Sequence, residues 1–184
     1  YKLPPGPVHL NVPFDEPLFI DSVEKNKTNF FSISRLKWNK PAENKIFILD
    51  KAKKPLIVVG PIENNHHQRD IIALSDKIQA PILSDPLSQI RFGYTSPQII
   101  AHYDHFLQIF DIQPDLIIRF GRKPTSKKLC KLLDDNKQQT YLIDSWVQYN
   151  DDCPNFIQAP IDIFCQKQIS GIIWEGKLEW KNLF

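Results

Sequence analysis

The stretch IIRFGRKPTSKKL, residues 117–129, carries five basic side chains and no acidic one. Either Thr125 or Ser126 can cap a helix that follows, which puts Lys127 and Lys128 in the first helical turn. Cations at that end oppose the helix dipole, at a cost of about 0.3–1 kcal/mol each. A bound carboxylate or phosphate would offset this cost. Alternatively, both lysines extend into solvent, where screening makes the cost small. The pattern favours an anion site.

A second polar stretch, PILSDPLSQIRFG at residues 81–93, also follows an apolar run. Its polar residues are Ser84, Asp85, Ser88, Gln89 and Arg91. One interpretation is turn chemistry, in which Ser and Asp side chains bond nearby amides and Pro86 sets the turn. The other is a loop that faces a ligand, because loops carry function on rigid scaffolds. The residue types are equally compatible with both.

The elements that must position these two stretches alternate regularly from residue 41 onward. Apolar runs predict strands at 55–60, 81–85, 114–121, 139–145 and 155–160. Helical spacing predicts helices over 41–54, 66–80, 97–110, 126–136 and 161–173. This alternation is typical of an α/β fold with a parallel sheet of about five to six strands and helices on both faces. Both polar stretches then lie at the carboxyl edge of the sheet, where such folds bind ligands.

The segment before residue 41 has a different pattern. Val8, Leu10 and Val12 alternate with other residues and predict a short strand that Pro13 closes. Residues 20–40 are polar and show no sustained period, so they are predicted to be a linker.

Composition excludes several classes of function. A net charge of +2 argues against nucleic acid, which needs a broad basic face. Three distant cysteines without a CxxC indicate reduced thiols, and we expect a cytoplasmic protein without membrane insertion. The glycines form neither a dinucleotide fingerprint nor a Walker loop. His102 and His105 share a helix face, but without a third ligand we interpret them as surface residues.

Five segments together resemble one enzyme family. They are GPVHLNVPFDEPL, PILSDPLSQIRFG, YDHFL, PDLIIRFGRKPTSKKL and YLIDSW. In order and spacing they are similar to 2-succinyl-5-enolpyruvyl-6-hydroxy-3-cyclohexene-1-carboxylate synthases, the thiamine-diphosphate-dependent transferases of menaquinone and phylloquinone biosynthesis. These enzymes decarboxylate 2-oxoglutarate and add the succinyl semialdehyde unit to isochorismate. The alternative hypotheses are a nucleotide- or metabolite-binding regulatory module and a structural spacer.

The resemblance also implies a domain organisation. Residues 1–19 would end an N-terminal pyrimidine-binding domain, 20–40 would be the linker, and 41–184 would be the Rossmann-like central domain. The family's partners are then the other two domains of the same chain and further subunits of a homodimer or homotetramer. Because the sequence begins without Met, we expect a piece of a longer protein.

The resemblance finally implies roles for individual residues. Lys127 and Lys128 match basic residues that contact substrate carboxylates, and Ser88 and Gln89 lie in the other loop expected to face the cavity. Arg122 is interpreted as a surface residue. The GDG-to-Asn motif for metal and diphosphate is absent, as is the glutamate that activates the thiazolium. Thiamine diphosphate and Mg²⁺ or Mn²⁺ are therefore expected to bind elsewhere in the full-length enzyme, with no catalytic, metal or cofactor residue and no FAD in this fragment, which alone would be inactive.

Overall fold

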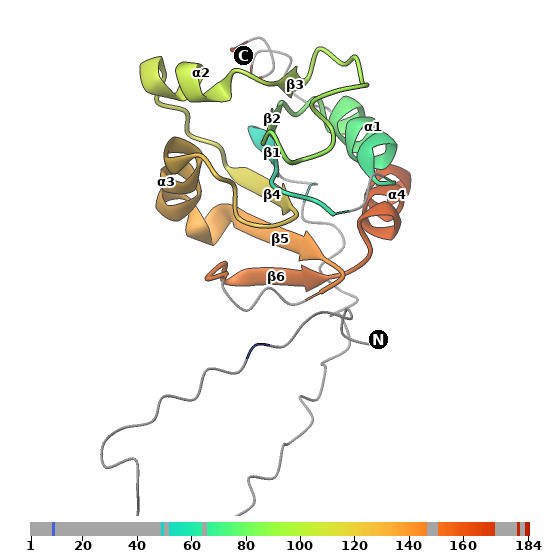
Figure 1. The fold of residues 1–184 in the computed structure, drawn as a ribbon. Helices are drawn as coiled ribbons and strands as arrows, with labels where there is room; N and C mark the ends of the chain where they lie inside the picture. The colour runs from blue at the N-terminus through green and yellow to red at the C-terminus, as the bar shows by residue number, and fades with distance from the viewer. Residues whose placement is uncertain are drawn as a thin grey trace, which may run out of the picture. The chain divides into compact units, whose positions relative to one another are not determined.

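The computed structural model describes residues 9, 49, 52–63, 66–146, 151–171, 180 and 183–184. Within this part of the chain, six parallel strands form one sheet in the order β3-β2-β1-β4-β5-β6 (Figure 1). The strands are β1 (Pro55–Val59), β2 (Ile82–Ser84), β3 (Ile99–Ile100), β4 (Leu116–Phe120), β5 (Thr140–Asp144) and β6 (Asn155–Gln158). The helices are α1 (Gln68–Ile78), α2 (Tyr103–Ile109), α3 (Lys127–Asp135), the 3-10 turn η3 (Lys137–Gln139) and α4 (Ile161–Gly171). The predicted α/β fold with a parallel sheet is confirmed.

Helices cover both faces of the sheet. Alternate residues of a strand point to opposite faces, so Ile57 and Val59 belong to one hydrophobic core while Leu56 and Val58 belong to the other. The first core is closed by α1 and α4, and the second by α2 and α3 (Figure 1). The central strands are buried on both faces, which explains why their sequences are apolar throughout.

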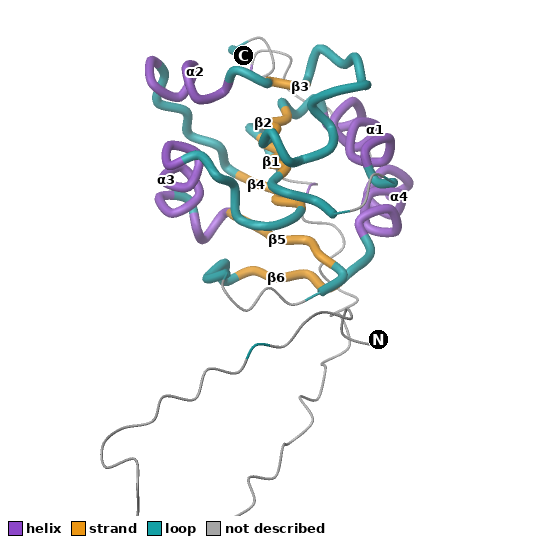
Figure 2. Tube along the Cα trace, viewed as in Figure 1, coloured by secondary structure: helices purple, strands orange, loops and turns teal. Residues whose placement is uncertain are grey.

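The region before β4 differs from its prediction. A single helix over 97–110 was expected, but Ile99 and Ile100 form strand β3, and α2 begins only at Tyr103 (Figure 2). Ile99 pairs with Ile82 of β2, whose amide also donates to the Gln98 carbonyl at 2.7 Å. Ile99 and Ile100 thus satisfy backbone groups of β2 that would otherwise be unpaired at the edge of the sheet. Both are β-branched, and this pairing outweighs the helical spacing of residues 97–110.

Two further predictions fall partly or wholly outside the described residues. The strand predicted around Val8–Val12 is described only at His9, which has no regular structure. The helix predicted over 41–54 is described at Leu49, which lies in a 3-10 turn, and at its end, where it is wrong. Lys53 and Lys54 form a bend because their amides donate to the Asp115 carboxylate, at 2.6 and 2.8 Å.

The loops after β1 and β4 are in backbone contact at the centre of the sheet. These neighbouring strands mark the switch point, because the chain builds outward from them in opposite directions. The Gly60 amide donates to the Phe120 carbonyl at 2.9 Å, and the Arg122 amide donates to the Pro61 carbonyl at 3.0 Å. A Cβ on Gly60 would lie 1.8 Å from the Arg122 carbonyl oxygen. The two loops therefore occupy the position where a sheet of this kind often admits a diphosphate.

Gly121 offers a test of this contact. Its φ is +75°, and a Cβ there would lie 2.6 Å from the Pro61 carbonyl oxygen. Gly93 has a similar φ of +80° but has no atom within 4 Å of its would-be Cβ. Both alanine substitutions strain the backbone, but only Gly121→Ala also creates a clash, so we expect it to lower the free energy of unfolding by about 1–3 kcal/mol more than Gly93→Ala does in urea denaturation. Equal losses would show that the loops do not pack as described.

Candidate functional site

The Asp85 carboxylate joins the two polar stretches at the carboxyl edge of the sheet. Asp85 directly follows β2 and is fully buried. Its Oδ1 accepts from the Leu87 amide at 2.9 Å, while Oδ2 accepts from both the amide and the hydroxyl of Thr125, each at 2.9 Å. One side chain thus shapes its own turn and fixes the start of the segment that leads into α3. The turn-chemistry interpretation of Asp85 is confirmed, but its second partner lies 40 residues away.

Ser126 is the N-cap of α3. Its hydroxyl oxygen accepts from the Leu129 amide at 3.1 Å, and its hydroxyl also donates to the Asp104 carboxylate on α2. Of the two predicted caps, Thr125 is therefore not used, because Asp85 binds it. The cap places Lys127 and Lys128 in the first helical turn, as predicted, and both side chains are exposed.

The five basic residues of the cluster separate into two groups. Arg119 lies buried within β4 and pairs with the buried Asp151. Arg122 pairs with Glu63 at the surface, and the Lys123 Nζ lies 3.4 Å from the Asp134 Oδ1. Within the described part of the chain, Lys127 and Lys128 form no side-chain hydrogen bond or ion pair. These two cations are thus the ones free to meet an anion.

Ser88 and Gln89 lie in the loop after β2. Ser88 is buried; its amide donates to the Asp85 carbonyl at 3.0 Å, and its hydroxyl oxygen accepts weakly from the Ile90 amide at 3.4 Å. Gln89 is exposed and adopts a positive φ of 59°. Ser88 thus acts in the turn, and the substrate roles assigned to both residues stay predictions.

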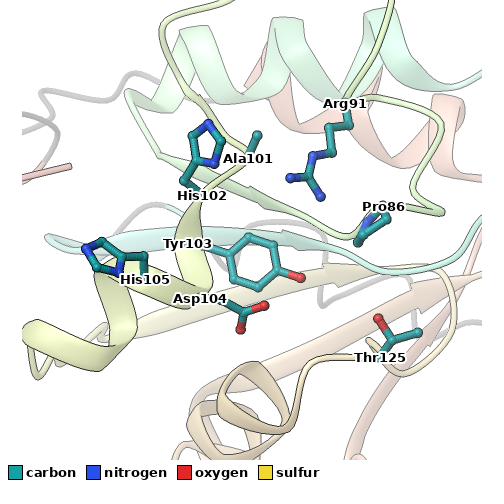
Figure 3. A pocket seen from close by; sticks show the side chains of 8 residues that line it. All are labelled: Pro86, Arg91, Ala101, His102, Tyr103, Asp104, His105 and Thr125. Atoms are coloured by element: carbon teal, nitrogen blue, oxygen red, sulfur yellow. The ribbon is translucent and has the colours of Figure 1, made fainter.

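A cavity of about 250 Å³ opens beside this junction (Figure 3). It is lined by Pro86, Arg91, Ala101, His102, Tyr103, Asp104, His105 and Thr125. The loop after β2, the start of α2 and the segment before α3 each contribute to the wall. Among these residues, Tyr103 was missed by the sequence analysis because its helix was predicted to begin earlier, and nothing in its local sequence marks a ligand-facing hydroxyl.

The Tyr103 ring is almost fully buried, at 2% exposure. Burial raises the pKa of its phenol from 10.0 to about 12, and the negative charges of Asp85 and Asp104 add to this rise. A phenol is protonated at neutral pH even at its ordinary pKa of 10.0, so the Tyr103 hydroxyl can donate a hydrogen bond into the cavity.

Other groups contribute less to a site. His102, the N-cap residue before α2, and His105 on α2 are both exposed, as expected for surface histidines, but they do not share a helix face because the helix begins only at Tyr103. Across the described ranges, no three His, Cys, Asp or Glu side chains come together as metal ligands. Burial raises the pKa of the Cys165 thiol, which lies in the core and has no access to a ligand. None of the helices among the described residues is both long and apolar enough to cross a membrane.

Sequence comparison identifies the fold's family. Residues 25–180, most of the chain, match the family model described as "Middle domain of thiamine pyrophosphate". The chain belongs to this middle-domain family. A member of such a family supplies one domain of a larger thiamine-diphosphate-dependent protein, and the site described above lies wholly within that domain.

Several curated relatives of this chain share one name. Proteins named 2-succinyl-5-enolpyruvyl-6-hydroxy-3-cyclohexene-1-carboxylate synthase include one from Bacillus pumilus (strain SAFR-032), 32% identical over 153 residues that cover 76% of this chain and 26% of the relative. One from Bacillus velezensis is 35% identical, covering 78% of this chain and 27% of the relative. One from Geobacillus kaustophilus is 28% identical, covering 98% and 34%. The chain thus spans about a quarter to a third of the length of these relatives.

Replacing Asp85 by asparagine tests the junction. The asparagine NH2 would face an amide donor, either at Leu87 or at Thr125, so at least one partly buried donor would lose its acceptor. We expect Asp85→Asn to lower the free energy of unfolding by about 1–3 kcal/mol in urea denaturation. Asp111→Asn alters an exposed carboxylate whose one hydrogen-bond partner among the described residues is Gln113, and it should change the free energy of unfolding by less than about 0.5 kcal/mol. A neutral Asp85→Asn would contradict the assigned hydrogen bonds.

The raised pKa of Tyr103 predicts a pH dependence. The folded state holds the phenolic proton more tightly than the unfolded chain does, so this contribution to stability is complete below pH 10 and is lost as the pH rises towards 12. We expect the unfolding free energy to fall between these pH values by up to about 2–3 kcal/mol more in the parent chain than in Tyr103→Phe. Identical pH profiles from chemical denaturation would contradict the burial of this hydroxyl. Tyr94→Phe, at a less buried ring, is the control.

Proposed function

We propose that the chain is the central domain of a synthase that decarboxylates 2-oxoglutarate on thiamine diphosphate and adds the succinyl semialdehyde unit to isochorismate. In this proposal residues 1–19 end the preceding domain and residues 20–40 link it to the central domain. The whole protein also contains a cofactor-binding third domain and acts as a homodimer or homotetramer in the cytoplasm. The shared name of the curated relatives supports the activity, and their greater length supports the further domains.

The role of this domain in the reaction is to bind substrate carboxylates. Both proposed substrates carry two carboxylates, and Lys127 and Lys128 are the first residues of α3, which follows the carboxyl end of β4. The observation that carries the proposal is that the other three basic residues of the cluster have carboxylate partners while these two have none in the described part of the chain. Ser88 and Gln89 are proposed to contribute from the neighbouring loop.

Thiamine diphosphate and its Mg²⁺ or Mn²⁺ are proposed to bind outside this domain. The described residues do not fit the metal, since they include no cluster of three ligating side chains. They do not fit a diphosphate at the switch point either, since the Gly60 and Gly121 loops lie against each other there. That contact also disfavours a nucleotide-binding module as the function. The contribution of this chain is therefore to bind and orient substrate.

Kinetics of the whole protein test the lysines. We expect Lys127→Ala to lower kcat/KM for 2-oxoglutarate or isochorismate about tenfold, mainly through KM, because it removes a charge-assisted hydrogen bond. Lys128→Ala should act in the same direction. Lys131→Ala is the matched control, an exposed lysine one turn further along α3, and should change kcat/KM less than about twofold. Unchanged kinetics in Lys127→Ala and Lys128→Ala would remove both residues from the site.

A further inference from the structure

The 250 Å³ cavity contains a cation that nothing in the described part of the chain neutralises directly. Arg91 is half-buried, and its guanidinium points into the cavity towards the space in front of Tyr103 (Figure 3). Among the described residues it forms no hydrogen bond and no ion pair. A guanidinium presents a planar fork of donors that matches a carboxylate or a phosphate. Arg122, in the loop after β4, is instead paired with Glu63.

A second donor faces the same space. The Tyr103 hydroxyl projects from a buried ring into the cavity (Figure 3), and no described residue binds it. Its phenol stays protonated well above neutral pH, and Arg91 lies near enough to influence its ionisation. The Tyr103 hydroxyl and the Arg91 guanidinium are both hydrogen-bond donors at neutral pH. Together they can bind one anionic group without a change in protonation state.

The acidic residues around the cavity are already bonded to protein donors. Asp85 accepts three hydrogen bonds, two of them from Thr125, and Asp104 accepts from the Ser126 hydroxyl. Their charges remain and oppose an anion. His102 and His105 stand on the α2 side of the wall. Since ligand pockets usually measure about 300–1,000 Å³, the size of this one selects a small ligand.

We propose that this cavity is a carboxylate-binding subsite in which the Arg91 guanidinium and the Tyr103 hydroxyl hold one carboxylate of a small dicarboxylate. The choice of a dicarboxylate rests on the proposed function. Thr125 lines the cavity two residues before Lys127, so the subsite adjoins the start of α3. One carboxylate would then meet Arg91 while the lysines remain available to the other. Arg91 and Tyr103 would set specificity for ligand length.

NMR titration of the 184-residue chain with succinate tests the subsite. The chain has five arginines, and Arg91→Lys assigns the Nε–H signal of Arg91 by its disappearance. We expect succinate to shift this signal saturably. Arg91→Ala should weaken succinate binding about tenfold or more, and Tyr103→Phe about threefold, as followed by backbone amide shifts. Arg122→Ala, which removes the paired arginine, should leave the affinity unchanged. An Arg91 signal that does not move, or equal affinity in Arg91→Ala, would overturn the proposal.

Two further arms separate the alternatives. Inorganic phosphate that binds as tightly as succinate, with the same dependence on Arg91, would overturn the assignment to carboxylates. Comparing the succinate titration with the kinetics of the Lys127 and Lys128 variants separates this subsite from the proposed function. If succinate still shifts the Arg91 signal while the whole protein's kinetics ignore Lys127 and Lys128, the subsite stands and the role of the lysines falls. If the lysine variants impair kinetics while succinate does not shift the Arg91 signal, the subsite is overturned and the proposed role of the lysines stands.

Discussion

The buried carboxylate of Asp85 is the interaction on which the candidate site depends. It accepts hydrogen bonds from the turn after β2 and from Thr125 in the segment after β4. A fully buried charge is costly unless its acceptors are satisfied, and three donors around one carboxylate meet that requirement. The same bonds fix Thr125, and therefore the N-cap at Ser126 and the first turn of α3. The position of Lys127 and Lys128 in the first turn of α3 follows from that cap.

The sheet makes this junction possible. β2 and β4 flank β1 on opposite sides, so the polypeptide segments that follow them must cross the end of β1 to meet. Gly60 and Gly121 allow the two loops at that end to pack against each other, because a side chain on either glycine would collide with the backbone of the opposite loop. These two glycines thus allow the close approach of the loops after β1 and β4, while Asp85, directly after β2, reaches Thr125 in the segment after β4. The proposed functions of this edge thus depend on the backbone packing at Gly60 and Gly121 and on the hydrogen bonds of Asp85.

Much of the fold was predictable because it depends on local patterns. The apolar runs of β1, β2, β4 and β5 and the helical spacing of Ile71, Leu74 and Ile78 report burial directly. The position of Lys127 in the first turn of α3 follows from the N-cap rule, which involves only residues 126–129. β3 was missed because two residues that pair with β2 carry too short a signal to outweigh a helical pattern. The Asp85–Thr125 contact was missed because its two residues are distant in sequence and only the assembled sheet brings them together. Tyr103 was missed because nothing in its local sequence marks a hydroxyl that faces a cavity.

A double-mutant cycle between Asp85 and Lys127 in the whole protein tests the central claim most directly. Values of kcat/KM for the parent, Asp85→Asn, Lys127→Ala and the double variant give the coupling energy between the two residues. If Asp85 positions Lys127 on a substrate, removing the lysine should cost less once the junction is broken, with a coupling of about 1 kcal/mol or more. Effects that add within about 0.5 kcal/mol would contradict the account, because they would show that the junction and the lysine act independently.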